Sequence, residues 1–237
     1  ILWQQTAAEY RGSATTIYRA AAEALPALGR ANQTGKPSVV VFDLDETVLD
    51  NSRFQGRLLH EARNYESALW DCWIGQRQAR AVPGMERLFG AMVRDGVRGR
   101  FITNRKCRLL AGDSDPCPQE ADTLANLNAL LAKTGYVATA QELMLSAEKD
   151  PAMATPWDDE KQARRDFVSR TSEIVMLVGD DLGDFLPDVR KASIAARAAL
   201  LAQVEDRWGS SWFLLPNPNY GSWVTAVDLE ATAIPAR

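Results

Sequence analysis

Histidine is almost absent from this chain, which carries one, His60, among its 237 residues. A single histidine excludes histidine-rich metal sites and any phosphatase that needs two histidines as nucleophile and acid. Asp and Glu together number 31. Any acid–base or nucleophilic chemistry is therefore expected to depend on carboxylates.

Long hydrophobic runs are also absent. The longest, residues 38–42 and 174–178, are far shorter than the roughly 20 residues needed to span a bilayer. The net charge of -4 disfavours a nucleic-acid polymer as partner, because proteins that bind one carry a basic surface. The chain starts at Ile1 without a Met, and we expect either a removed signal peptide or a trimmed segment upstream.

Cysteine is scarce, with three residues and no Cys-x-x-Cys pair, which disfavours a zinc site. Cys107 and Cys117 flank a stretch rich in Gly, Asp, Ser and Pro that is typical of a loop. Two interpretations remain open: a disulfide that closes this loop, or two unrelated thiols. A disulfide would indicate an oxidising compartment. No role is predicted for Cys72.

Strand and helix patterns alternate along the chain and predict an α/β fold with a mostly parallel sheet. Residues 50–82 break the alternation and are predicted to form a small helical cap, helped by the N-terminal helix, on a single domain spanning 1–237. The expected helices are 4–28, 84–93, 118–133 and 159–170, and the expected strands are 38–42, 100–103, 143–145, 174–178 and 213–215.

Acidic residues follow two of the predicted buried strands. Asp43 and Asp45 leave the first strand on one side, and Asp180 and Asp184 follow the strand at 174–178. Ligands of parallel sheets bind beyond the carboxyl ends of the strands, so these carboxylates are expected to converge there. Such a cluster repels itself unless a cation lies within it, and oxygen ligands favour Mg²⁺. The alternative, that acidic residues merely populate loops, does not explain both clusters together.

Several segments resemble motifs of the haloacid-dehalogenase-like (HAD) superfamily, and the chain most resembles its class C acid phosphatases. These are DDDD phosphohydrolases that include bacterial lipoprotein 5′-nucleotidases. The resemblance covers nearly the whole chain and implies a Rossmann-like three-layer sandwich with a small helical cap. It rests on residues 2–10 (LWQQTAAEY), 42–52 (FDLDETVLDNS), 103–105 (TNR), 179–185 (GDDLGDF) and 215–223 (LPNPNYGSW).

The resemblance implies a role for each acidic residue. Asp43 would be the nucleophile and a Mg²⁺ ligand. Asp45 would be the general acid and then the base for water, and its main-chain carbonyl would also bind the metal. Asp180 would complete the metal shell, with Asp184 supporting it. Asp181 stands where the family commonly has Asn, and we expect it to add negative charge next to the metal.

The resemblance also implies phosphate-binding groups. Thr103 and the amide of Asn104 would hold phosphate oxygens. The family's third motif is a lysine, for which Lys149 and Lys161 are candidates. We favour Lys161, because Arg164 follows it in a Lys-x-x-Arg pattern similar to the family's. Its charge would offset that of the nucleophile and of the transferred phosphoryl group.

Aromatic residues in the predicted cap are candidates for substrate recognition. Tyr65, Trp70 and Trp73 could stack on a nucleoside leaving group, and the resemblance places Tyr220 beside the nucleobase. The alternative interpretation is that these rings form the core of the cap.

The sequence thus predicts a Mg²⁺-dependent acid phosphatase that hydrolyses phosphomonoesters through an aspartyl-phosphate. A phosphotransferase with the same intermediate and a catalytically silent storage or binding relative are the alternatives. The resemblance implies a periplasmic, secreted or outer-membrane lipoprotein location, with any lipid anchor upstream of Ile1. Many relatives form homodimers, so a dimer is a further expectation.

Overall fold

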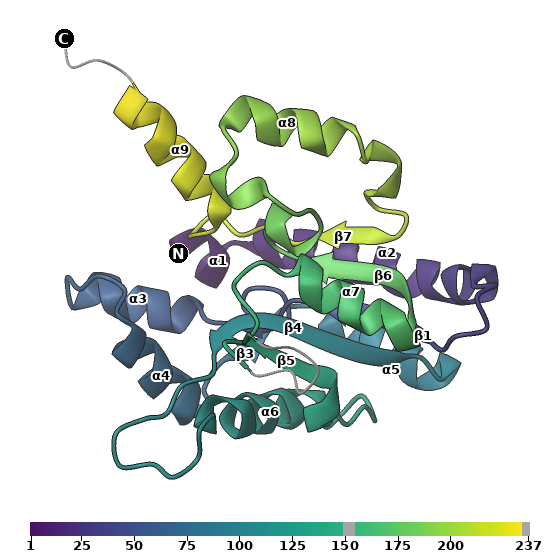
Figure 1. Ribbon diagram of the computed structural model, residues 1–237, viewed down its shortest axis with the longest axis horizontal. Coiled ribbons are helices and arrows are strands. Elements are labelled where there is room, and N and C mark those ends of the chain that lie inside the picture. The colour runs from purple at the N-terminus through teal and green to yellow at the C-terminus, as the bar shows by residue number, and fades with distance from the viewer. Residues whose placement is uncertain (149–154, 234–237) are drawn as a thin grey trace.

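A computed structural model describes residues 1–148 and 155–233. Its centre is a parallel sheet of five strands in the order β5-β4-β1-β6-β7 (Figure 1). The strands are β1 (Ser38–Phe42), β4 (Arg98–Lys106), β5 (Leu143–Ser146), β6 (Glu173–Gly179) and β7 (Trp212–Leu214). The prediction of a mostly parallel α/β fold is confirmed.

The side chains of β1 alternate between two hydrophobic cores, which makes the fold a three-layer sandwich. Val40 and Phe42 pack in one core, whereas Val39 and Val41 point into the other. The first core is covered by α2 (Ala8–Ala31), α5 (Met85–Asp95) and α6 (Pro118–Leu131), and the second by α7 (Gln162–Thr171). A strand buried on both faces explains the unbroken run of apolar residues in β1.

The segment predicted to be a cap holds two short helices that project beside the sheet (Figure 1). They are α3 (Ser52–His60) and α4 (Ser67–Gln76), which lie between the antiparallel strands β2 (Leu49–Asp50) and β3 (Arg80–Ala81).

The N-terminal helix expected at 4–28 consists of two helices, α1 (Leu2–Thr6) and α2, separated by the extended residue Ala7. In α1, Gln5 donates a hydrogen bond to the carbonyl of Ser52 at 2.9 Å and so supports α3. By contrast, α2 packs against α5, β6 and β7. Its main role is therefore to cover the sheet rather than to support the cap.

Two further helices near the C-terminus, α8 (Ile194–Ala202) and α9 (Ser222–Ala233), were not predicted. Short 3₁₀ helices complete the described structure: η1 (Ala140–Glu142), η2 (Leu182–Asp184), η3 (Val189–Lys191) and η4 (Glu205–Arg207).

A disulfide joins Cys107 at the end of β4 to Cys117 before α6, with their Cα atoms 4.7 Å apart. Of the two interpretations of this pair, the structure has the bonded one. Cys72 is a free, exposed thiol on α4.

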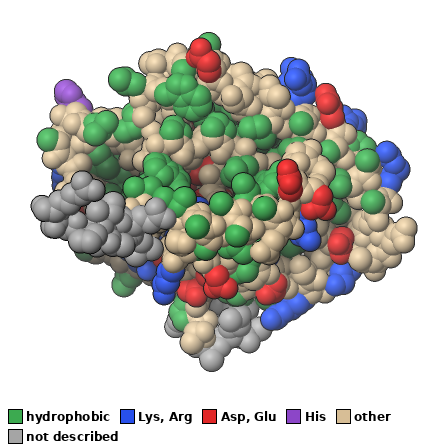
Figure 2. All heavy atoms as spheres, turned by 90° about the horizontal axis from the view of Figure 1, so that it is seen from above, with side chains coloured by type: hydrophobic (Ala, Val, Ile, Leu, Met, Phe, Trp, Pro, Cys, Tyr) green, Lys and Arg blue, Asp and Glu red, His purple; other side chains and the backbone are tan. Residues whose placement is uncertain are grey.

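The surface agrees with the composition. On the face drawn in Figure 2, basic and acidic side chains are interspersed and no basic patch gathers, and a central hollow exposes acidic atoms among hydrophobic ones. No helix within the described residues is both long enough and apolar enough to cross a membrane.

Candidate active site

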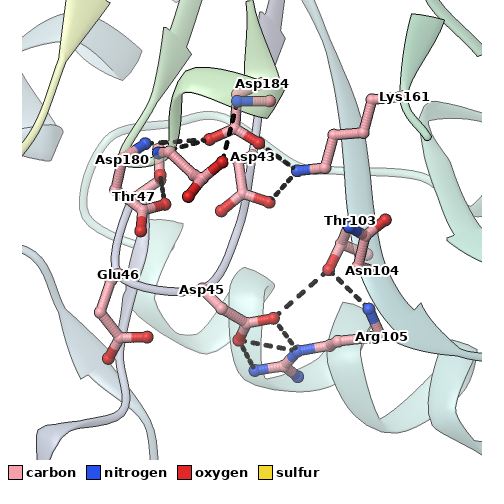
Figure 3. A network of polar contacts seen from close by, with 12 residues as sticks. Asp43, Asp45, Glu46, Thr47, Thr103, Asn104, Arg105, Lys161, Asp180 and Asp184 are labelled. Atoms are coloured by element: carbon pink, nitrogen blue, oxygen red, sulfur yellow. Dashed lines mark hydrogen bonds and ion pairs between the residues drawn. The ribbon is translucent and has the colours of Figure 1, made fainter. Parts of the chain in front are cut away.

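Three carboxylates meet at the carboxyl ends of β1 and β6, which are neighbours in the sheet (Figure 3). Asp43 directly follows β1, and its amide donates to the carbonyl of Val178 in β6 at 2.9 Å. One carboxylate oxygen from each of Asp43, Asp180 and Asp184 lies within 4.8 Å of the others. The convergence expected from the sequence is therefore present in the fold.

The third carboxylate is held by a tight loop after β6. One oxygen of Asp184 accepts hydrogen bonds from the amides of Asp180 at 3.0 Å and Asp181 at 2.9 Å. A Cβ at position 179 would lie only 2.5 Å from this side chain, so Gly179 is required for the close approach. The first glycine of the GDDLGDF motif is therefore required by the packing of Asp184 against the chain.

Lys161 lies against this cluster and is almost fully buried, with 4% of its surface exposed. Its ammonium forms an ion pair with Asp184 at 2.7 Å and another with Asp43. Although burial opposes the charged form, Asp184 and Asp43 raise the pKa of Lys161. Lys149, the other candidate, lies outside the described residues.

The acidic cluster carries more negative charge than Lys161 offsets, and the pKa values of its carboxyl groups are raised. Burial, together with the charges of Asp184 and Asp45, raises the pKa of Asp43 to about 6 despite the opposing effect of Lys161. Burial and the charge of Asp43 raise the pKa of Asp180 well above its usual range. Three carboxylates with one ammonium leave an excess of negative charge that a divalent cation would offset.

Asp45 points away from this cluster and toward Arg105, a residue to which the sequence analysis assigned no role (Figure 3). The guanidinium Nη2 donates to Asp45 Oδ1 at 2.7 Å, and Nε lies 3.0 and 3.2 Å from its two oxygens. Arg105 is 1% exposed and also donates to Thr123 at 3.0 Å. Its place as the third residue of TNR was the signal that could have found it.

Thr103 and Asn104 lie next to these groups at the end of β4. The Thr103 hydroxyl donates to Asp45 Oδ2 at 3.3 Å, and its side chain is fully buried. Arg164 donates to the Thr103 carbonyl at 2.6 Å and to the Asn104 side chain at 2.7 Å. The arginine of the Lys-x-x-Arg pattern thus fixes the TNR segment.

A cavity of about 430 Å³ opens over the acidic cluster, Lys161, Asn104 and Arg105. Thr103, which is fully buried, does not line it. Tyr65 and Trp70 from the cap segment line it, as does Tyr220 from residues 215–223, here called the C-terminal signature. Gln55 and Arg190, which were not predicted, line it too. The complete lining is Asp43, Asp45, Gln55, Tyr65, Trp70, Asn104, Arg105, Lys161, Asp180, Asp181, Asp184, Arg190, Tyr220, Gly221 and Ser222.

Trp73, which the sequence analysis grouped with the substrate contacts, does not line this cavity. Its side chain is 7% exposed, and its indole N–H donates to Asn51 at 2.8 Å. The alternative interpretation, a ring in the core of the cap, describes Trp73 correctly, because α4 turns it inward.

Asp181, which was expected to add negative charge beside the metal, lines the same cavity as the acidic cluster, and its carboxylate also binds the C-terminal segment. It accepts from the amide of Ser222 at 2.6 Å, from the Ser222 hydroxyl at 2.7 Å and from the amide of Gly183 at 2.8 Å. Gly221, with φ +148°, brings the chain close enough for this contact. Asn217 donates to Asp180 at 2.8 Å, so the C-terminal signature contacts the acidic cluster too.

These features agree with the family to which the chain belongs: HAD superfamily, subfamily IIIB (acid phosphatase), whose model matches residues 1–223. Among solved structures, it is similar to the class C acid phosphatase from Bacillus anthracis with tungstate bound. The two share 31% sequence identity and a TM-score of 0.79 over 96% of this chain and 86% of the other. A second structure of the Bacillus anthracis enzyme gives a TM-score of 0.78 at the same identity and coverage.

Curated relatives are more distant. The chain is 26% identical to the stem 28 kDa glycoprotein of Glycine max over 180 residues, which is 76% of this chain and 58% of the relative. It is 27% identical to a stem 31 kDa glycoprotein of the same plant over 146 residues, or 62% of this chain and 45% of the relative. The chain thus spans about half the length of these relatives.

Proposed function

We propose that this protein is a Mg²⁺-dependent acid phosphatase that hydrolyses phosphomonoesters through an aspartyl-phosphate on Asp43. One observation carries the proposal: Asp43 lies between Lys161 and two further carboxylates, with Asp45 in the same cavity. Family membership and a relative with bound tungstate, a tetrahedral oxyanion like phosphate, support it.

The donor set fits a hard divalent cation. Carboxylates of Asp43, Asp180 and Asp184 offer oxygen ligands, and neither His nor Cys is present in the cluster. The main-chain carbonyl of Asp45 is the further ligand that the family resemblance implies. When bound, the cation supplies positive charge that offsets the carboxylates and the phosphoryl oxygens.

The protein's own residues perform the first transfer. An oxygen of Asp43 forms a bond to phosphorus as the bond from phosphorus to the ester oxygen breaks. Lys161 neutralises charge on Asp43 and on the phosphoryl group. Asn104, fixed by Arg164, provides an amide at the same end of the sheet, and Thr103 lies beside it.

Asp45 moves the proton in both steps. It gives a proton to the leaving oxygen, and then accepts one from the water that attacks phosphorus, which restores Asp43 and releases phosphate. Arg105 holds the Asp45 carboxylate in place. Two carboxylates in different surroundings, one beside Lys161 and one on Arg105, can therefore take different roles.

The cavity favours an aromatic leaving group. Tyr65, Trp70 and Tyr220 give it aromatic walls, and stacking contributes roughly 1–3 kcal/mol per base. Nucleoside monophosphates and aryl phosphates are the substrate classes that such walls suit.

The test is hydrolysis of a phosphomonoester with Mg²⁺, with EDTA, and by Asp43→Asn. We expect turnover that requires the metal and is lost in Asp43→Asn, whose circular dichroism spectrum stays that of the wild type. Near-normal turnover by Asp43→Asn would refute the nucleophile. Inactivity of the wild type with Mg²⁺ on a panel of substrates would favour a silent storage or binding relative, and transfer to an added alcohol would favour a phosphotransferase.

The disulfide supports a location in an oxidising compartment, and we propose a periplasmic, secreted or outer-membrane lipoprotein form. A lipid anchor upstream of Ile1 and a homodimer belong to the same proposal. Fractionation of the producing cells and light scattering of the purified protein would test these points.

A further inference from the structure

A chain of buried hydrogen bonds connects the cap to Asp45 through Asn51. The indole N–H of Trp73 on α4 donates to Asn51 Oδ1 at 2.8 Å. The Asn51 amide nitrogen donates to Asp45 Oδ1 at 2.9 Å and to the carbonyl of Leu49 at 3.0 Å. Asn51 has no exposed surface, so its side chain has no water to replace these partners.

Trp73 on one side and the acceptors of Asp45 and Leu49 on the other together fix which way the Asn51 amide faces. An indole N–H is only a donor, so it requires the carbonyl oxygen of the amide on its side. The opposite orientation would direct that oxygen at the Asp45 carboxylate and leave two acceptors facing each other. Removing the indole N–H would therefore leave Asn51 Oδ1 buried without this donor, which loosens the amide that binds Asp45.

The opposite side of the same turn is held by Glu46. This residue is fully buried, has φ 61°, and accepts the Asn51 main-chain N–H at 2.8 Å. Its other oxygen accepts the hydroxyl of Tyr220, which lines the cavity. A non-glycine residue keeps such a left-handed conformation only where its surroundings fix it. Both the cap and a cavity wall therefore brace the position of Asn51.

The contacts leave the two Asp45 oxygens unequal. Oδ1 receives Asn51 at 2.9 Å and Arg105 Nη2 at 2.7 Å, whereas the donors to Oδ2 lie at 3.2 Å and 3.3 Å. The more weakly bound oxygen is the better candidate to carry a transferable proton. Asn51 thus binds the oxygen that does not need to be free.

We propose that Asn51, oriented by Trp73, is a positioning residue that keeps Asp45 Oδ2 directed at the leaving-group oxygen. The inference rests on the proposed function, in which Asp45 protonates that oxygen. Neither residue lines the cavity, so neither is expected to contact the substrate. Their effect is expected on proton donation rather than on substrate binding.

The leaving group provides the test. p-Nitrophenolate leaves readily without protonation, whereas phenolate depends more strongly on it. The two phosphate esters have nearly the same shape. General acid catalysis is worth about 10²–10⁴ in rate, so its partial loss must fall mainly on the poorer leaving group. For Trp73→Phe, which removes the N–H and leaves a smaller ring, we expect kcat/KM on phenyl phosphate to fall about tenfold. This ratio reports transfer to Asp43 and excludes the second step, which both esters share. The expected fall in kcat/KM on p-nitrophenyl phosphate is under about threefold.

Two reference variants make the outcomes distinct. Asp45→Asn should give the steepest dependence on the leaving group. Trp212 is buried to a similar degree but lies outside the cavity, so Trp212→Phe should leave the rate on both esters unchanged. If circular dichroism shows that Trp73→Phe does not fold, Asn51→Ser repeats the test with Trp73 in place.

Suppose that Trp73→Phe and Asn51→Ser lower kcat/KM equally on both esters, while Asp45→Asn loses far more on phenyl phosphate. That result would overturn the positioning role and leave the proposed function intact. If Asp45→Asn loses the same factor on both esters, the assignment of Asp45 as general acid is overturned, and the inference with it. If Trp212→Phe also loses more on phenyl phosphate than on p-nitrophenyl phosphate, lost stability causes the effect. That result would overturn the inference too.

Discussion

The buried ion pair between Arg105 and Asp45 gives the strongest prediction for stability. The two side chains are 1% and 16% exposed, and the guanidinium contacts the carboxylate through both Nε and Nη2. Replacing one partner of a buried pair costs about 3–5 kcal/mol, because the other charge is left without compensation. Since Asp45 keeps some solvent contact, we expect Arg105→Met to lie at the lower end, about 3 kcal/mol.

For a chain of this size, such a loss lowers the melting temperature by about 6–12 °C. The assay is thermal and urea unfolding of wild type and variant. Arg77→Met is the matched control, since Arg77 pairs with Asp122 at 2.6 Å but is 53% exposed. An exposed pair of this kind contributes about 0–1 kcal/mol. Equal losses in Arg105→Met and Arg77→Met would refute the argument that burial decides the energy of the pair.

A double-mutant cycle separates the ion pair from packing. Arg105 also contacts Thr123 and lies over the ring of Trp70 at 5.5 Å, and these contacts are lost in Arg105→Met whatever happens at Asp45. When Asp45 is already Asn, we expect Arg105→Met to cost at least about 1 kcal/mol less. Additive losses would assign the effect to packing alone.

Three further predictions concern the metal cluster and the disulfide. In EDTA, the folded protein binds more protons than the unfolded chain between pH about 4 and about 6, because the pKa of Asp43 is raised to about 6. Stability in urea should therefore fall as pH rises through this window, relative to Asp43→Asn, and a flat difference would contradict the raised pKa. Adding Mg²⁺ should raise the melting temperature of wild type and have little effect on Asp180→Asn; an equal rise in both would exclude Asp180 as a ligand. Replacing Cys107 and Cys117 together by Ser should cost about 2–3 kcal/mol in urea unfolding, and a loss below about 1 kcal/mol would contradict the loop-closure argument.

The sheet and the acidic cluster could be predicted because both depend on local patterns. The run of β-branched residues in β1 and the apolar run of β6 mark strands buried on two faces, and a carboxylate that directly follows a strand must lie at its carboxyl end. Asp43 and Asp180 thus follow from position alone. That β1 and β6 are neighbours was a condition of the prediction, and the strand order of the structure meets it.

The partners of Asp45 could not be predicted in the same way. Arg105, Asn51 and Glu46 stand inside quoted motifs, yet their spacing does not say which buried acceptor each one meets. A hydrogen-bond partner is decided by how β4, the turn after β1 and the C-terminal segment pack together. That information arises only in the tertiary structure.

The aromatic residues show the same limit within one helix. Trp70 and Trp73 are three residues apart on α4, so both fall toward one side, and both are nearly buried. Helical spacing does not separate the ring that borders the cavity from the ring that hydrogen-bonds behind it. The pattern was sufficient for burial and insufficient for function.

The missed helix α8 has a different cause. Its residues are mostly Ala and Leu, but none is buried, so it presents no core-facing stripe of the kind that marks an amphipathic helix. Ser193 caps its first turn by accepting the amide of Ala196 at 3.2 Å. That cap was the one local signal for its start.

The contacts of the C-terminal signature bear on the order in which the site forms during synthesis. Asn217, Tyr220 and Ser222 bind Asp180, Glu46 and Asp181, respectively. A ribosome completes the first motif early and these three residues late. A nascent chain that has emerged only as far as β7 can form the whole sheet, yet it lacks one wall of the cavity and the amide that holds Asp180. The order of synthesis therefore places completion of the cavity after completion of the sheet.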